Sequence, residues 1–169
     1  MNASIENDLP KELRMKIMTS CFFIGHRETD PALLPEIKAA AESLIRQQQV
    51  SDFYVGMYGN FDRLVGEAVI QLKREYPDVR LFLVLPYHPA DRPIEVPLGY
   101  DGTFYPDGME AVSRRYAIAK ANRKMIDASG FLIAYVTHTV SNAYDLLEYA
   151  MRRQRKGLIQ VINLGECRT

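Results

Sequence analysis

Residues 21–27 read Cys-Phe-Phe-Ile-Gly-His-Arg: four apolar residues, then at once a glycine, an imidazole and a guanidinium. The apolar run predicts a buried strand, and the glycine predicts its end. A strand end requires only a turn residue, whereas this one adds two side chains that suit a phosphate or a carboxylate. The stretch therefore predicts the first strand of a sheet and a candidate binding position at its carboxyl end.

Four further apolar runs follow, at 52–56, 79–86, 131–136 and 157–164. Between them, apolar residues at helical spacing predict helices from Asp30 and Pro31 onward and over 61–76, 110–129 and 142–156. Strands that alternate with helices predict an α/β fold. We expect a Rossmann-like three-layer fold with a mainly parallel five-stranded sheet. In such sheets, ligands bind beyond the carboxyl ends of the strands.

The length of 169 residues suits one domain, which we place at 17–169, with an N-terminal appendage at 1–16. Lys plus Arg and Asp plus Glu both total 21, so the formal net charge is zero. This balance disfavours nucleic acid as a partner. Two cysteines, no apolar signal segment and no apolar run of about 18 residues predict a cytoplasmic protein with no membrane partner. The composition leaves a homo-oligomer open.

Residues 87–109 form a long irregular segment rich in proline and glycine. A loop of this length in a compact domain is often an active-site lid or a disordered segment. Tyr87, Tyr100 and Tyr105 make it less polar than a typical disordered linker. We therefore expect a lid over the strand ends, with Tyr100 or Tyr105 free to stack on a base.

The junction after the second strand carries Gly56, Met57, Gly59 and Asp62 and leads into a helix. Its glycines allow close approach of a ligand to the backbone, and the helix N-terminus offers amides to an anion. The glycines also suit an ordinary turn, and both readings stay open. After the fourth strand, Ser141 or Asn142 either caps the next helix or presents its amides to a ligand.

The three histidines, His26, His88 and His138, all follow predicted strands. No cysteine or second histidine stands at metal-ligand spacing, so the sequence predicts no metal site. It indicates no cofactor either. Arg27 has two open readings: it contacts a ligand, or it pairs with a carboxylate such as Glu28 or Asp30.

The segments 23–27, 55–77, 82–86 and 116–136 together resemble the SLOG superfamily, which includes the Smf/DprA and LOG proteins, and in particular its small bacterial YpsA-type members. The resemblance spans residues 20–164. Its most specific part is the turn Gly56-Met57-x-Gly59, followed by Asp62 and, five residues on, Glu67. The resemblance implies a Rossmann-like fold that binds nucleotides or nucleotide-derived ligands at the strand ends.

Within that family, three activities are known: hydrolysis of the N-glycosidic bond of nucleoside monophosphates, binding of single-stranded DNA, and nucleotide sensing. The resemblance implies catalytic roles for Arg123, Asp145 and Glu67 if the chain is a hydrolase. The family's Gly-Gly-Thr turn is replaced here by Val140-Ser141-Asn142. Valine does not readily take the positive φ of glycine, so we expect nucleotide binding, as a sensor or binding module, without efficient hydrolysis. Gly25, His26, Arg27, Gly56, Met57, Gly59, Asp62, Tyr100, Tyr105, Ser141 and Asn142 are the expected ligand-binding residues.

Overall fold

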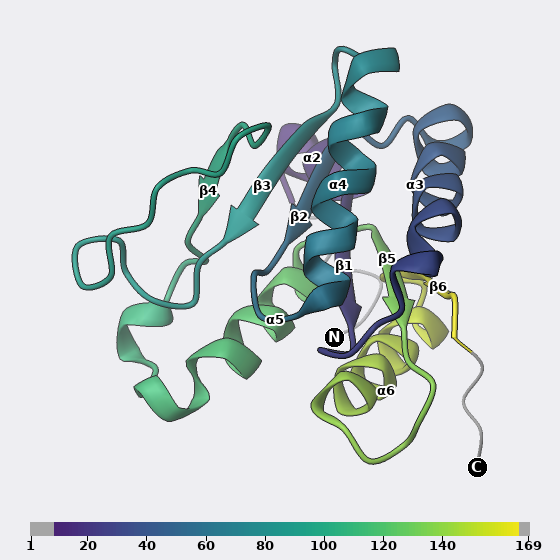
Figure 1. Ribbon diagram of the computed structural model, residues 1–169. Coiled ribbons are helices and arrows are strands. Elements are labelled where there is room, and N and C mark those ends of the chain that lie inside the picture. The colour runs from purple at the N-terminus through teal and green to yellow at the C-terminus, as the bar shows by residue number, and fades with distance from the viewer. Residues whose placement is uncertain (1–8, 166–169) are drawn as a thin grey trace.

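A computed structural model describes residues 9–165 of the chain (Figure 1). Within these residues, six parallel strands form one sheet in the order β4-β3-β2-β1-β5-β6. The strands are β1 (Ser20–Gly25), β2 (Asp52–Val55), β3 (Arg80–Val84), β4 (Gly102–Phe104), β5 (Phe131–Tyr135) and β6 (Gln160–Asn163). The α/β class and the parallel sheet between helices are confirmed.

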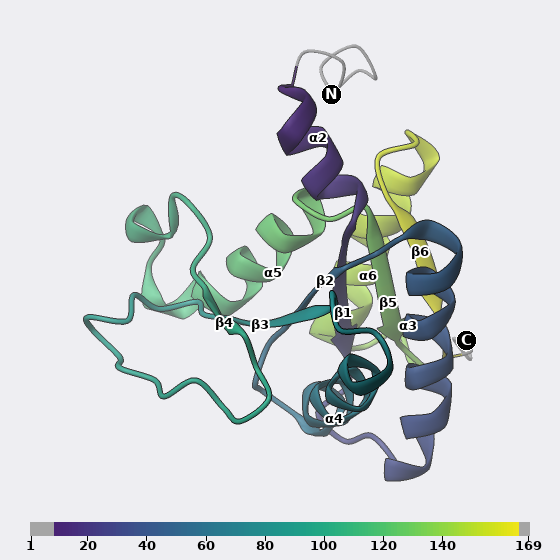
Figure 2. The ribbon, with the colours of Figure 1, turned by 90° about the horizontal axis from the view of Figure 1, so that it is seen from above.

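Helices cover both faces of the sheet, which gives three layers (Figures 1 and 2). One buried cluster joins the sheet to α3 (Leu34–Gln48) and α4 (Asn60–Glu75) and includes Phe23 and Phe53. The other joins it to α5 (Ala117–Asp127) and α6 (Asn142–Arg155) and includes Phe22 and Leu132. Successive residues of β1 thus point to opposite faces, which explains its continuous apolar run.

The expectation of five strands is wrong, because the segment 87–109 contains β4. Gly102 and Phe104 pair with Phe82 and Val84 of β3, and the amide of Leu85 donates to the carbonyl of Phe104 at 2.8 Å. Three residues beside prolines and glycines carry no strand pattern of their own, so the pairing depends on β3. Short 3-10 turns follow at Met109–Ala111 and Arg114–Tyr116 and lead into α5.

The chain reverses its direction of travel across the sheet at β1. It moves outward from β1 through β2, β3 and β4, then returns by way of α5 to β5 on the other side of β1. β1 consequently pairs with both β2 and β5, with Gly25 opposite Tyr135. This topological switch point leaves a crevice beyond the carboxyl end of β1, where α/β proteins bind ligands.

Two local expectations concern the first helices. Asp30 does act as a cap: its carboxylate accepts from the amide of Ala32 at 2.9 Å and begins the 3-10 turn Pro31–Leu33 that precedes α3. The expected appendage 1–16 lies in part outside the described residues. From Lys11 to Met18 the chain is a helix, α2, that has no buried residue and projects from the start of β1 (Figure 2). No helix within residues 9–165 is long and apolar enough to cross a membrane.

Candidate functional site

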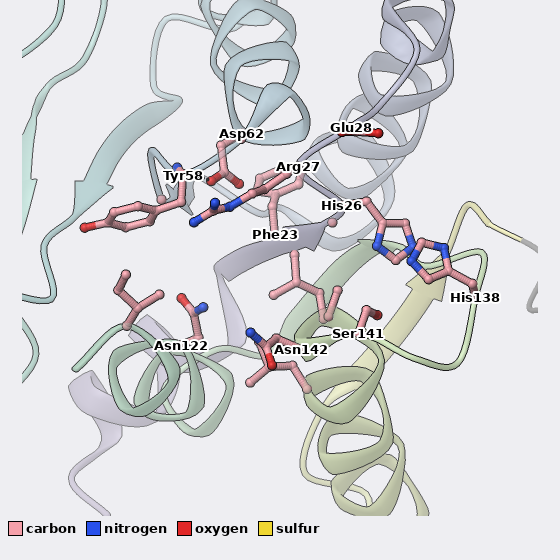
Figure 3. Close-up of a pocket in the computed structure, with 17 residues that line it drawn as sticks. Phe23, His26, Arg27, Glu28, Tyr58, Asp62, Asn122, His138, Ser141 and Asn142 are labelled. Carbon is pink, nitrogen blue, oxygen red and sulfur yellow. Dashed lines mark hydrogen bonds between the residues drawn. The ribbon is translucent and has the colours of Figure 1, made fainter. Parts of the chain in front are cut away.

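A cleft of about 500 Å³ lies beyond the carboxyl ends of β1, β2 and β5 (Figure 3). The junctions that follow these three strands all contribute to its wall, together with the first turns of α4 and α6 and one face of α5. The residues that line it are Phe23, Ile24, Gly25, His26, Arg27, Glu28, Gly56, Tyr58, Gly59, Asp62, Ile118, Asn122, His138, Ser141, Asn142, Ala143 and Leu146. The cleft therefore occupies the switch point of the sheet.

Gly25 admits a neighbouring helix. A Cβ at this position would lie 2.2 to 2.7 Å from ring atoms of Phe61, the second residue of α4. Such distances are far below van der Waals contact, so the absence of a side chain lets α4 approach β1. The glycine of the first junction thus sets the position of the helix that borders the cleft.

The junctions after β1 and β2 are fastened to each other. The amide of Asn60 donates to the carbonyl of Arg27 at 2.9 Å, and a Cβ at Gly59 would lie 2.6 Å from the Cα of Arg27. Gly59 is also the N-cap of α4 and supplies no side-chain cap. Close backbone contact therefore requires glycine here, and it brings Arg27 to the N-terminus of α4.

Arg27 is exposed and forms no ion pair with a carboxylate among residues 9–165. The reading in which it pairs with Glu28 or Asp30 finds no support in this geometry. Figure 3 shows its side chain extending beside Tyr58 and Asp62, across the cleft from Asn122 and Asn142. A guanidinium in this position, next to a helix N-terminus, is suited to an anionic ligand.

Asp62 is a largely buried carboxylate in the wall of the cleft. One of its oxygens, Oδ2, accepts from the amide of Tyr58 at 2.8 Å and so closes the turn between β2 and α4. Burial raises the pKa of Asp62 from 3.8 to about 6, and the Tyr58 amide opposes this shift only in part. A carboxylate with a raised pKa in a cleft is a candidate contact for a hydrogen-bond donor of a ligand.

Tyr58 lines the cleft but was not among the expected site residues. Burial raises the pKa of its phenol to about 12, so the hydroxyl remains protonated at neutral pH. Its position between Gly56 and Gly59 is that of an ordinary turn residue, so no local pattern marks it as a site residue. Tyr58 therefore supplies the aromatic surface that was expected from Tyr100 or Tyr105.

The junction after β5 leads into α6 with a conventional cap. Ser141 Oγ accepts from the amide of Tyr144 at 3.0 Å, so the N-cap reading is confirmed. Ser141, Asn142 and the buried Ala143 also line the cleft. The N-termini of α4 and α6 thus face one cleft from opposite sides of β1, and Asn122 of α5 adds an amide between them.

Two histidines close one end of the cleft. The rings of His26 and His138 stack with centroids 3.9 Å apart and planes 11° apart. His26 is buried and its Nε2 accepts from the amide of Thr137 at 3.0 Å, whereas His138 is exposed. Burial lowers the pKa of His26, and the neighbouring His138 lowers it further.

Three residues expected to act in catalysis lie outside the lining of the cleft. Arg123 stacks over the ring of Tyr149 at 4.8 Å, one helical position away from Asn122, which does line the cleft. Glu67 is half-exposed and forms a 3.9 Å ion pair with Arg63 on α4. Asp145 is an exposed residue in the first turn of α6. The structure therefore does not bring these three side chains together.

Three expected ligand-binding residues also lie elsewhere. Met57 is about half-exposed beside the turn. Tyr100 packs against α4, where its hydroxyl fills the space that a side chain at Gly66 would need. Tyr105 packs against the cluster of α5 and α6 and contacts His88 edge-on at 5.3 Å. No residue of 87–109 lines the cleft, so the segment is not a lid in this structure.

In comparisons with known proteins, neither a family model nor a curated protein sequence matches the chain. Among residues 9–165, no three His, Cys, Asp or Glu side chains are grouped so that they could hold a metal ion. The polar groups of the cleft are one arginine, two histidines, two helix N-termini, two asparagines, a serine, a tyrosine and the carboxylates Glu28 and Asp62.

Proposed function

We propose that the chain binds a nucleotide or a nucleotide-derived ligand in this cleft and acts as a sensor or binding module. One observation carries the proposal: the N-termini of α4 and α6 face the same cleft, with the exposed guanidinium of Arg27 beside the N-terminus of α4 and across the cleft from that of α6. Helix N-termini and a forked guanidinium favour a phosphate. Nucleotide binding is also what the resemblance to SLOG proteins implies.

The remaining lining residues suit the rest of a nucleotide. The ring of Tyr58 offers a surface on which a base stacks, and Asn122 and Asn142 offer both donors and acceptors. With a pKa of about 6, the carboxyl of Asp62 is mostly ionised at neutral pH and accepts hydrogen bonds from a hydroxyl or an amino group. The cleft volume of about 500 Å³ fits a ligand of mononucleotide size.

Hydrolysis of an N-glycosidic bond is the second candidate, and the structure gives it less support than binding. The three side chains expected to catalyse it lie outside the cleft lining. Only Asp62 offers a carboxylate with a raised pKa in the cleft among residues 9–165. Binding of single-stranded DNA would require a basic face, which the zero net charge disfavours.

Calorimetry with nucleoside monophosphates, the matching nucleosides and ribose 5-phosphate tests the proposal. Arg27→Ala should weaken binding of a monophosphate by about 10- to 150-fold, because a charge-assisted hydrogen bond contributes roughly 1.5–3 kcal/mol. It should leave the affinity for the nucleoside nearly unchanged. Arg123→Ala is the matched control, since it removes an arginine that lies outside the cleft.

An assay for free base and ribose 5-phosphate on the same samples separates binding from turnover. Measurable binding without release supports a sensor or binding module. Rapid release that disappears in Asp62→Asn would make the chain a hydrolase. Absence of binding for every compound in the panel would refute the proposed function.

A further inference from the structure

We propose that His26 is a positioning residue of the cleft. Its neutral imidazole holds the segment 137–141 against the end of β1, and its protonation releases this segment together with the N-terminus of α6. Ligand binding then weakens at acid pH. The binding part of this inference rests on the proposed function, whereas the coupling of His26 to the segment does not.

The hydrogen bond between His26 and Thr137 defines the protonation state of the ring. A backbone amide can only donate, and the Thr137 amide points at His26 Nε2 from 3.0 Å. Nε2 therefore carries a lone pair, and the single ring proton lies on Nδ1. Protonation would place a second N–H opposite the amide, and the bond would be lost.

The ring also lies where a positive charge is unfavourable. His26 is only 8% exposed, and His138 stacks on it from the segment 137–141. From β5, Tyr135 meets the ring edge-on with centroids 6.1 Å apart, and its phenol is the titratable group of that strand near His26. Arg27 and Glu28, which follow His26 directly in the chain, are the charged residues of its own segment.

No carboxylate within residues 9–165 forms an ion pair with the His26 imidazole that would stabilise its charged form. Burial lowers the pKa of His26, in agreement with these surroundings. The neutral ring is thus the form that fits the folded protein.

The segment that His26 holds leads directly into the cleft. Thr137 begins it, and Ser141 ends it as the N-cap of α6. Ser141, Asn142 and Ala143 line the cleft, so displacement of the segment moves part of the proposed phosphate contact. Val136 is held separately, because its amide donates to Asn163 Oδ1 at 3.1 Å. Release on protonation is therefore confined to the residues that follow Val136.

The sign of the pH effect follows from the direction of the pKa shift. Because the pKa of His26 is lower in the folded state than in the unfolded chain, the contribution of its neutral ring to folded-state stability is fully present above about pH 6.5. The contribution is lost as the pH falls through the folded-state pKa. Asp62 acts in the opposite direction, since its protonation near pH 6 removes a negative charge from the cleft.

Two substitutions separate the role of His26 Nε2 as a hydrogen-bond acceptor from the effect of the charge on the protonated ring. His26→Gln places an amide oxygen near the position of Nε2, where it accepts from Thr137 but does not titrate. His26→Leu removes the acceptor at every pH. His88→Gln is the control, because His88 is exposed, lies outside the cleft and has its own Nδ1 acceptor contact with the Ala90 amide.

Affinity for AMP is measured by calorimetry from pH 5 to pH 8 for wild type, His26→Gln, His26→Leu and His88→Gln. Dividing the wild-type dissociation constant by that of His26→Gln cancels the titration of the phosphate and of Asp62. This ratio should rise by up to about 10-fold for each pH unit below the His26 pKa. His26→Leu should bind weakly throughout, and His88→Gln should follow wild type. A ratio that stays constant from pH 5 to pH 8 overturns the inference.

A second measurement needs no ligand. Long-range nitrogen–proton NMR of the histidine rings should show His26 as the Nδ1–H tautomer at pH 8. Hydrogen exchange should show a protection factor for the Thr137 amide that falls with His26 protonation in wild type but not in His26→Gln. An Nε2–H tautomer, or pH-independent protection, overturns the inference. If AMP and the other nucleotides do not bind at any pH, the proposed function fails while this measurement still decides the role of His26.

Discussion

Asp62→Asn should stabilise the folded protein at neutral pH. Burial raises the pKa of this carboxyl from 3.8 to about 6, so the ionised form is disfavoured in the folded state. The protonated carboxyl of Asp62 stabilises the folded state relative to the unfolded chain. This contribution is fully present below about pH 3.8 and is lost as the pH rises through about 6. Asparagine resembles the protonated carboxyl at every pH and avoids this loss.

The size of the effect follows from the shift. A change of about two pKa units, at about 1.36 kcal/mol for each unit, gives about 3 kcal/mol between the two extremes of pH. Asp62→Asn should therefore increase the free energy of unfolding by about 2–3 kcal/mol at pH 8, and by less than about 1 kcal/mol at pH 4. For a chain of 169 residues, each kcal/mol moves Tm by roughly 2–4 °C.

Urea unfolding at pH 4, 6 and 8 measures this difference directly. Glu67→Gln is the matched control, because it makes the same chemical change on the exposed face of α4, where the ion pair with Arg63 contributes little. An Asp62→Asn variant that is equally or less stable than wild type at pH 8, with no trend between pH 4 and pH 8, would refute the reasoning.

Two further predictions concern the shape and the surface of the cleft. Tyr58→Ala should reduce affinity for a nucleotide by roughly 1–3 kcal/mol, whereas Tyr105→Ala should not, because only Tyr58 lines the cleft; calorimetry decides between them. Gly59→Ala should destabilise the protein by about 1–3 kcal/mol and weaken binding, because the added Cβ would lie 2.6 Å from the Arg27 Cα. Gly102→Ala, where the nearest atom is 3.7 Å away, should change neither quantity, and equal effects of the two alanines in thermal unfolding would contradict the steric argument.

Five of the strands and the helices between them could be predicted because each has its own local pattern. β1 and β3 each contain a continuous apolar run, and α4 carries an apolar stripe that its buried residues confirm. β4 has no such pattern: Gly102, Thr103 and Phe104 are all only partly buried, and they form a strand because β3 offers them its edge. Pairing of this kind depends on residues distant in the chain.

The site was predictable to the level of the junctions and not of the side chains. Parallel strands end at one edge, so Gly25, Gly59 and Ser141 had to lie near one another. A difference of one residue along a helix decides which side chain faces the cleft. On α5, Asn122 lines the cleft, whereas the next residue, Arg123, stacks on Tyr149. The contact of His26 with Thr137 joins residues 111 positions apart, for which no local pattern exists.

The short strand β4 has a consequence for self-association. Its three residues cover the outer edge of β3. Lys73 fixes the residues just before β4 by donating to the Gly99 carbonyl at 2.8 Å and to Asp101 Oδ2 at 2.6 Å. An uncovered apolar strand edge is a template for pairing with another chain. Proteolytic cleavage within 87–98, or loss of the Lys73 contacts, would expose that edge of β3 and favour aggregation by strand addition, at a place remote from the cleft.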